Sequence, residues 1–537
     1  MSKKPKLILN PNQPAFLGDD LWLPEELVRN PFLDTDHYKF IHHMMFPKET
    51  TWLYHTWTPR MSRINGCEHA VFFGLQGVLA KLRFDFQKGF FDRSEEEVIA
   101  EIREQIEWTY AKTNPEMAEN FDYQSFRELH RVGYLPILIK ALPEGAFVPI
   151  QVPMFTVENT LAEFYWLPGY LEVILSSSLW QGMVDATIAD IYKRIFNRYA
   201  EMTSDTPEAT FAQGGDFSMR GLTGPDSAQR VGAAHLTSFG VTSTVSARPY
   251  VMAYYGAGPD VNSYGPSSEH AVMCSYGMNE VETYLALIHP EYGRFKSGNI
   301  TIVSDTYDFW GVIDKVLPSI KDVILSRDGK VSIRPDSGDP VKILCGDAES
   351  SEPSVRKGLV ERLWEIFGGE VNSKGYKVLD CHIGGTYGDS ITPPRAEVTC
   401  QQLATKGFAS TNVVFGIGSY TYQYNTRDTQ CYGYKATAAI IDGEFRKIFK
   451  DPKTDRDKEN SFKKSQKGLV AVVRDESGEW VLIDDLDFEQ IRQYDVYPYR
   501  NRLLPVFKNG YFVSATLNNF DVVRRRVARE SVRVYGS

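Results

Sequence analysis

Four short hydrophobic runs in the middle of the chain each end in a charged residue or a glycine. They cover residues 299–308, 331–340, 378–390 and 412–419. Helical patterns separate them, and this alternation predicts parallel strands joined by helices. In barrels built this way the active site lies at the carboxyl ends of the strands. We therefore expect the polar residues that follow these runs to gather at one end of a barrel.

The flanking segments have other patterns. Residues 70–130 and about 160–200 are expected to be helical, and in the second stretch apolar residues recur at steps of three and four, namely Ile188, Ile191, Tyr192, Ile195 and Tyr199. Strand-like runs lie at residues 51–60 and 137–157. Two pairs of strand-like runs near the C-terminus flank Ser477-Gly478 and Asn509-Gly510, and this predicts β-hairpins.

These elements predict an α/β fold, an irregular α/β barrel with a second β-rich domain built from the N- and C-terminal parts of the chain. The expected barrel-like domain covers residues 161–420. Residues 1–160 and 421–537 are expected to supply the two parts of the β-rich domain. The arginine run at 524–526 is expected to lie on a solvated or salt-bridged helix face.

Composition limits the possible partners. Of the 537 residues, 42% are hydrophobic and 24% are charged, which is ordinary for a globular protein. The net charge of −10 and the pI near 5.6 argue against broad binding to nucleic acid or to an anionic membrane. They leave room for a local basic pocket that holds a phosphorylated small molecule.

The cysteines and the N-terminal segment indicate in which cellular compartment the protein is expected, namely the cytoplasm. The six cysteines are scattered and include no C-x-x-C pair, so we expect free thiols rather than disulfides or a zinc site: Cys67, Cys274, Cys345, Cys381, Cys400 and Cys431. The basic N-terminus lacks a hydrophobic region long enough for a signal peptide. No run of about 18 apolar residues predicts a membrane span. We therefore expect a soluble, cytoplasmic protein.

Glycine-containing loops after two of the strands are candidate phosphate sites, because backbone N–H groups can approach oxyanions where no Cβ intervenes. Gly388-Asp389 and Gly416-x-Gly418 have this form, and Arg427 and Lys435 could complete an anion site. Taken singly, each loop is more often an ordinary turn, and each cation more often forms a surface salt bridge.

Two aspartates at strand ends are candidates for chemistry. Asp305 and Asp336 could hold a divalent ion or face a developing sugar cation, although a single such Asp is more often a helix cap. Phe217, Tyr38 and His270 are by default packed residues. These residues alone predict an α/β enzyme that acts on a phosphorylated small molecule.

A set of ordered motifs is more specific. GGDFSMRG, SSEH, VSDTYD, IRPDSGDP, GDSIT, FGIGS and NTRD occur in this order, with TDHYK, FTVENT and FKDP elsewhere in the chain. With these motifs the chain resembles the nicotinamide phosphoribosyltransferase family over residues 30–515 or so. The resemblance implies a homodimer of two-domain subunits with each active site at the dimer interface. It also implies Mg²⁺-dependent transfer of the 5-phosphoribosyl group of phosphoribosyl pyrophosphate to nicotinamide, which gives nicotinamide mononucleotide, a precursor of NAD.

The resemblance implies a role for each matching residue. Phe217 would stack on one face of the pyridine ring and Tyr38 of the partner subunit on the other, which suits a small flat heterocycle. Arg334 would reach the carboxamide and the ribose. The other expected substrate-binding residues contact diphosphate, ribose or phosphate, or lie beside those that do: Arg220, His270, Arg60, Lys450, Gly388, Asp389, Gly418, Arg427, Lys435 and Asp36.

The chemistry accounts for these residue types. Loss of pyrophosphate creates oxocarbenium character on the ribose and negative charge on the leaving group, which carboxylates and cations respectively stabilise. The expected catalytic residues are Asp305, Asp336, His270 and Arg334, and the two aspartates are also the expected metal ligands. The resemblance further implies that ATP can phosphorylate His270, which would couple ATP hydrolysis to tighter substrate binding.

Three positions depart from the family pattern and leave alternatives open. Ser243 stands where nicotinamide-using relatives carry an Asp that accepts a hydrogen bond from the carboxamide and repels nicotinate. Ser419 replaces a phosphate-loop glycine, and Tyr264 replaces a pocket serine. A nicotinate phosphoribosyltransferase is therefore an alternative, although Ser243 can still satisfy an amide. A catalytically silent binding or signalling relative is a second alternative, which predicts the loss of cations and acids that this chain retains.

Overall fold

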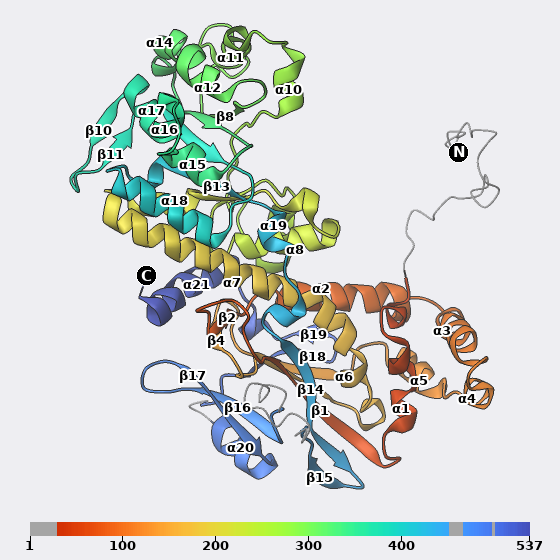
Figure 1. The fold of residues 1–537 in the computed structure, drawn as a ribbon. Coiled ribbons are helices and arrows are strands. Elements are labelled where there is room, and N and C mark those ends of the chain that lie inside the picture. Colours follow the sequence, from red (N-terminus) through yellow and green to blue (C-terminus); the bar gives the residue numbers. More distant parts are fainter. Residues whose placement is uncertain (1–28, 451–464, 497–499, 537) are drawn as a thin grey trace, which may run out of the picture.

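A parallel sheet forms one half of the protein in the computed structural model, which describes residues 29–450, 465–496 and 500–536. Its six strands run in the order β7–β6–β13–β12–β9–β8 (Figure 1). Isolated parallel bridges join Val241 to Ser263 and Ser267 to Thr301, so the intervening segment connects the two edge strands. The expected irregular barrel is confirmed. The strands are β6 (Gly214–Asp216), β7 (Val241–Thr242), β8 (Ile300–Val303), β9 (Val331–Arg334), β12 (Ile383–Tyr387) and β13 (Val413–Ile417).

Two of these strands were not expected from the sequence. β6 lies in a segment that reads as a glycine-rich turn, and β7 lies in a Ser/Thr-rich one. The strand carries a glycine at position 214 because the Phe239 ring fills the space beside it. A Cβ at Gly214 would lie only 2.8 Å from that ring. The run at 378–390 also divides, because β11 (Lys377–Leu379) pairs with β10 (Gly369–Val371) in a separate antiparallel sheet before β12 begins.

An antiparallel sheet of seven strands forms the other half. The order is β15–β14–β1–β5–β3–β18–β19, so three N-terminal strands lie between two pairs of C-terminal strands and confirm the expected β-rich unit. Both predicted hairpins are present, and Asn509 and Gly510 have φ angles of 50° and 81°, as a tight turn requires. The strands are β1 (Thr50–Pro59), β3 (Ile137–Ala141), β5 (Phe155–Asn159), β14 (Tyr432–Ile441), β15 (Glu444–Lys447), β18 (Leu504–Lys508) and β19 (Tyr511–Phe512).

Helices account for most of the remaining chain. Residues 70–130 are largely helical, as expected, apart from β2 (His69–Val71), which pairs with β4 (Phe147–Pro149). The TDHYK motif forms a short 3₁₀ helix, His37–Ile41, followed by α1 (His42–Met45). The longer helices are α2 (Leu75–Phe86), α3 (Glu95–Tyr110), α5 (Gln124–Val132), α7 (Glu172–Thr203), α8 (Pro225–His235), α9 (Ala247–Tyr255), α11 (Glu280–Ile288), α17 (Leu359–Phe367), α18 (Pro393–Thr405), α20 (Phe488–Asp495) and α21 (Phe520–Tyr535).

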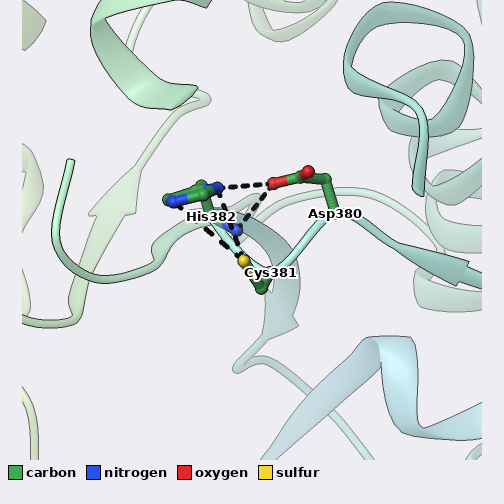
Figure 2. A group of neighbouring side chains, drawn as sticks. All are labelled: Asp380, Cys381 and His382. Carbon is green, nitrogen blue, oxygen red and sulfur yellow. Dashed lines mark hydrogen bonds and ion pairs between the residues drawn. The ribbon is translucent and has the colours of Figure 1, made fainter. Parts of the chain in front are cut away.

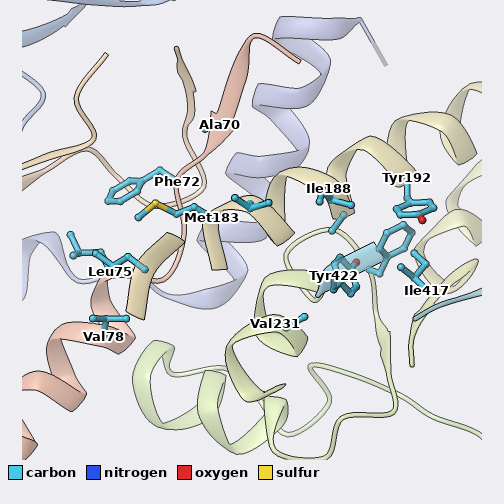
Figure 3. Packing of buried hydrophobic residues seen from close by; sticks show 14 of the residues in the cluster. Ala70, Phe72, Leu75, Val78, Met183, Ile188, Tyr192, Val231, Ile417 and Tyr422 are labelled. Atoms are coloured by element: carbon cyan, nitrogen blue, oxygen red, sulfur yellow. The ribbon is translucent and has the colours of Figure 1, made fainter. Parts of the chain in front are cut away.

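The helix α7 joins the two halves through its buried face. Met183 contacts Trp57 of the antiparallel sheet, with 3.4 Å between Sδ and Nε1. Further along α7, the Tyr192 hydroxyl donates to the carbonyl of Ile391, 2.9 Å away, beyond the tip of β12. Figure 3 shows side chains of α7 lying between residues of β2 and α2 on one side and of α8 and β13 on the other. The predicted apolar stripe of α7 therefore forms the core between the two sheets.

The helix α21 differs from its expected role. Arg524 does not lie on a solvated face, because its guanidinium donates to the main-chain carbonyls of Leu236, Phe239 and Val261 at 2.6–3.1 Å. The C-terminal helix is thereby fixed to the loops around β7. Among the described residues, no helix is long and apolar enough to cross a membrane, and all six cysteines are free thiols.

Candidate functional site

The tips of β8 and β9 are joined by the Asp305 carboxylate. Its Oδ2 accepts hydrogen bonds from the Asp336 backbone N–H at 2.8 Å and from the Ser337 hydroxyl at 2.6 Å. Its Oδ1 is buried without a hydrogen-bond partner and lies 3.8 Å from Nε2 of His270. The side chain of His270 is about half exposed, and its Nδ1 lies 3.2 Å from the Thr306 hydroxyl. Asp305 therefore offers one free oxygen beside an accessible imidazole.

The end of β9 supplies a cation beside these acids. Arg334 donates from Nη1 to the Ser267 hydroxyl at 2.9 Å, and its Nη2 lies 3.9 Å from Oδ2 of Asp336. Tyr387, at the end of β12, donates to the Gly338 carbonyl at 2.9 Å. Burial raises the pKa of Tyr387, and the charges of Asp389, Asp305, Asp336 and Asp339 raise it further. The strand tips therefore bring several carboxylates to one place.

The Phe217 ring packs closely against two glycines. A Cβ at Gly416 would lie 2.4 Å from the ring, and one at Gly388 would lie 3.3 Å from it. No other ring stacks on Phe217 within the described chain, because its contact with Tyr264 is edge-on, with centroids 6.3 Å apart at 71°. Phe217 thus presents a half-buried aromatic surface at the tips of β12 and β13.

A buried carboxylate fixes the loop that carries Phe217. Asp216 is fully buried, and its Oδ1 accepts from the backbone N–H and the hydroxyl of Ser218 at 2.9 and 2.6 Å. Its Oδ2 accepts from the hydroxyls of Thr242 and Thr244 at 2.6 and 2.8 Å. Four hydrogen bonds therefore hold the loops after β6 and β7 against each other.

Ser243 lies between those two threonines and binds the same residue through the main chain. Its backbone N–H and its hydroxyl both donate to the Asp216 carbonyl, at 2.9 and 2.8 Å. A carbonyl can only accept, so the Ser243 hydroxyl proton is already committed. Its oxygen can then offer only lone pairs to a ligand.

A second set of expected site residues lies on the antiparallel half. Glu172 accepts from Lys39 at 2.6 Å and lies 3.7 Å from Nζ of Lys435. Partial burial lowers the pKa of Lys435, Glu172 opposes this shift, and Arg60 and Arg427 add to it.

Tyr38 is half exposed beside this set. Partial burial raises its pKa, and the nearby charges of Glu172 and Asp36 act in the same direction. Its ring contacts the His42 ring, with centroids 5.0 Å apart, and Nζ of Lys39, 5.4 Å from the Tyr38 centroid. Within the described residues, Tyr38 and Phe217 are thus not paired with each other.

The remaining expected residues lie on exposed loops. Arg220 is exposed on the short helix Met219–Gly221, and Ser419 lies against Gly221, where a Cβ would come within 2.5 Å of the Ser419 Cβ. Gly418 is the N-cap of the short helix α19 (Ser419–Tyr422). Lys450 is exposed, and its backbone N–H donates to the Ser465 hydroxyl at 2.9 Å.

Comparison with known proteins places this geometry in a family. Residues 212–493 match the model of the nicotinate phosphoribosyltransferase (NAPRTase) family. The chain belongs to this family. A protein of Acinetobacter baylyi named nicotinamide phosphoribosyltransferase is 42% identical over 517 residues, which cover 93% of this chain and 97% of that protein. One of Mycoplasma pneumoniae with the same name is 32% identical over 443 residues, which cover 80% and 93%.

The fold is found among solved structures as well. The crystal structure of nicotinate-nucleotide pyrophosphorylase from Pyrococcus furiosus superposes with a TM-score of 0.55 at 14% sequence identity, covering 96% of this chain and 98% of that one. At this identity the likeness concerns the fold. The resemblance seen in the sequence motifs is confirmed by the family match.

A separate group of potential metal ligands lies away from the strand tips of this NAPRTase-family chain. Asp380, Cys381 and His382 are consecutive, and their ligand atoms lie within 4.8 Å of one another (Figure 2). The group precedes β12, so it is at the opposite end of the strand from Gly388. Asp380 accepts from the backbone N–H of His382 at 2.9 Å and lies 2.7 Å from its Nδ1, which accounts for the cluster as a turn.

Several residues of this family site were missed from the sequence. Asp216 and its partners Thr242 and Thr244 read as parts of turns, yet they set the position of Phe217 and Ser243. A carboxylate that follows two glycines and a Thr-x-Thr pair further along the chain are the only signals. Neither specifies that the two segments meet.

Replacing Asp216 by Asn should weaken binding of the pyridine base without unfolding the protein. The amide NH₂ cannot accept from the hydroxyls, so the loops lose part of their fixation, and we expect the KM for the base to rise about tenfold. Unfolding free energy should fall by about 1–3 kcal/mol. Steady-state kinetics and urea unfolding measure these changes. Asp205→Asn, which makes the same substitution at a surface carboxylate and removes one acceptor contact there, is the control. An unchanged KM in Asp216→Asn would contradict the positioning role.

Proposed function

We propose that the protein transfers the 5-phosphoribosyl group of phosphoribosyl pyrophosphate to nicotinamide, forming nicotinamide mononucleotide and pyrophosphate for NAD biosynthesis. The observation that carries this proposal is that Asp216 fixes both the loop with the Phe217 ring, which packs against Gly416 and Gly388, and the acceptor oxygen of Ser243. A flat pyridine ring with a carboxamide matches both features. The relatives that carry this activity in their names support it.

The reaction needs charge stabilisation and alignment more than proton transfer. The pyridine nitrogen attacks C1′ with its lone pair while the bond from C1′ to the pyrophosphate oxygen breaks, and pyrophosphate leaves with both electrons. Phe217 aligns the ring, and the carboxylates of Asp305 and Asp336 face the positive charge that develops on the ribose. Arg220 and Arg334 neutralise the phosphate groups of the substrate.

The strand-tip acids fit a magnesium ion. Mg²⁺ prefers carboxylate oxygens and is commonly held by one or two of them together with substrate phosphates. The buried, unpartnered Oδ1 of Asp305 and the nearby Asp336 carboxylate supply such oxygens. When bound there, Mg²⁺ would neutralise the departing diphosphate.

Ser243 favours nicotinamide over nicotinate. Its proton is donated to the Asp216 carbonyl, so it can accept a hydrogen bond from a carboxamide NH₂ but has no proton left for a carboxylate. A nicotinate carboxylate would meet lone pairs on oxygen and lose its hydration without compensation. Ser243 can thus discriminate as an acceptor, in the place where an aspartate does so in relatives.

We also propose that two copies of the chain complete each site. The strand-tip residues lie on the parallel half and the Tyr38 set on the antiparallel half (Figure 1). No described ring stacks on Phe217, and Tyr38 is exposed beside the cations Arg60, Arg427 and Lys435. A homodimer in which Tyr38 of the partner subunit covers the pyridine ring would use both surfaces.

His270 is the candidate for phosphorylation by ATP. The transfer would move the terminal phosphoryl group of ATP to a ring nitrogen and release ADP. The ring is accessible, and Asp305 and Thr306 lie beside its two nitrogens. A phosphate there would add negative charge at the metal-binding acids and so tighten the hold on Mg²⁺.

An assay in which nicotinamide and nicotinate compete as substrates tests the proposed phosphoribosyl transfer and its base preference. With phosphoribosyl pyrophosphate, Mg²⁺ and equal concentrations of nicotinamide and nicotinate, we expect predominantly nicotinamide mononucleotide, quantified by chromatography. Ser243→Ala should lower the amide preference by about tenfold, because one hydrogen bond is lost, and Ser243→Asp should restore it. Predominant nicotinate mononucleotide from the unaltered protein would favour the nicotinate enzyme. Neither product, from a folded protein, would favour the silent relative.

Mixing inactive variants tests the shared site. Phe217→Ala and Tyr38→Ala should each be nearly inactive, but unfolding and refolding them together should recover roughly a quarter of the activity, because half of the dimers carry one intact site of two. Mixing Phe217→Ala with Arg334→Ala, which lie in the same set, should recover none. Equal recovery in both mixtures, or none in either, would contradict the shared site.

Labelling tests the ATP reaction. Incubation with γ-labelled ATP should give an acid-labile label that is absent from His270→Ala and retained in His382→Ala, a histidine outside the site. The label is measured after rapid gel filtration. Equal labelling of His270→Ala would exclude this residue as the phosphoryl acceptor.

A further inference from the structure

A cleft of about 430 Å³ lies on the antiparallel half, far along the chain from the strand tips. It is enclosed by α21, by the hairpin of β16 (Leu469–Arg474) and β17 (Trp480–Leu486), and by β18 with the loop that follows β19. Its volume falls within the range of small-molecule sites, about 300–1,000 Å³. The residues that line it include none of those placed at the candidate active site.

The cleft is strongly basic in an acidic protein. Four arginines line it against one glutamate, a net charge of +3, whereas the whole chain carries −10. The glutamate, Glu530, is buried and accepts from Arg474 at 2.8 Å and from Arg533 at 3.0 Å. Its charge is therefore already neutralised within the protein.

Two of the arginines have no acidic partner. Arg502 and Arg529 are exposed and form no ion pair with any described residue. Arg526, one helical turn before Arg529, donates to the main-chain carbonyl of Glu144 and leaves its charge uncompensated. Residues three apart on a helix share a face, so Arg526 and Arg529 both present their positive charges to the cleft.

These cations repel one another at close range. Burial lowers the pKa of Arg526, and the positive charge of Arg529 lowers it further. Glu144 and Glu530 oppose this shift, and Arg474 adds a smaller lowering effect. Partly buried like charges without counterions raise the free energy of the folded state. An anion in the cleft would relieve this cost, and a guanidinium fork matches phosphate oxygens in pairs.

Apolar side chains also line the cleft, and an inorganic ion would gain nothing from contact with them. They are called the apolar floor below. Leu504, Val506 and Leu517 line it together with Trp480. The Trp480 ring is 95% buried under the Arg474 guanidinium, which lies 3.3 Å from the ring centroid. The buried indole N–H of Trp480 has no acceptor among the described residues. The site thus combines cations, a free donor and apolar surface.

We propose that this cleft binds an organic phosphate, a molecule with one or more phosphoryl groups on an apolar or aromatic body, at a site separate from the active site. Arg502, Arg526 and Arg529 hold the phosphate, and the apolar floor takes the body of the ligand. A nucleotide has this chemistry.

Calorimetric titration with adenosine monophosphate tests the proposal. Arg502→Ala/Arg529→Ala removes two exposed side chains without disturbing the core and should weaken binding to the cleft at least about tenfold, because two charge-assisted contacts are lost. Arg525→Ala, an exposed arginine on the same helix outside the cleft, should bind as the unaltered protein does. Arg220→Ala separates the two sites, because it should alter the active site and leave cleft binding intact.

Four results would overturn the proposal, three of them on the cleft itself. One is unchanged binding in Arg502→Ala/Arg529→Ala. Another is equal weakening in Arg525→Ala, which would indicate a general charge effect. The third is binding of inorganic phosphate as tightly as adenosine monophosphate, because the apolar floor would then have no role. Loss of all binding in Arg220→Ala would assign the ligand to the active site and would equally exclude the cleft.

Discussion

The carboxylate of Asp216 is the constraint on which the candidate site depends. A fully buried carboxylate is costly unless hydrogen bonds replace its water, and four donors do so here. Because those donors come from two loops, movement of either loop would leave a buried carboxylate oxygen without its hydrogen bonds. These bonds also hold Phe217 and Ser243 in place, because Phe217 follows Asp216 and Ser243 lies between Thr242 and Thr244 in the sequence.

The same arrangement bears on the role proposed for Ser243. The Asp216 carbonyl takes up the only hydroxyl proton of Ser243, which leaves this side chain as an acceptor. The proposed specificity at this position is therefore a property of the pair and not of the serine alone. The glycines under Phe217 have a related role, because any side chain at Gly416 would displace the ring.

Hydrophobic patterning predicted the larger features and failed where glycine and threonine carried the structure. The runs at 299–308, 331–340 and 412–419 became strands, and both hairpins were marked by their turn residues. β6 was missed because two glycines give no apolar signal, although they are needed to admit the rings of Phe239 and Phe217. The motifs located the strand-tip residues, but the contact between Asp216 and Thr242 depends on two strands packing side by side, which no local pattern encodes.

In the antiparallel sheet, N-terminal strands pair with C-terminal strands, and this determines when each strand can find its partner during synthesis. β1 lies between β5, about 100 residues away, and β14, nearly 400 residues away. The parallel sheet is complete once β13 has emerged from the ribosome, whereas β1 keeps an open edge until residues 432–441 follow. Such long-range pairing is slow, and an unpaired edge can recruit other chains. A nascent chain of this protein therefore has its most aggregation-prone surface near its beginning, and only the last fifth of the sequence covers it.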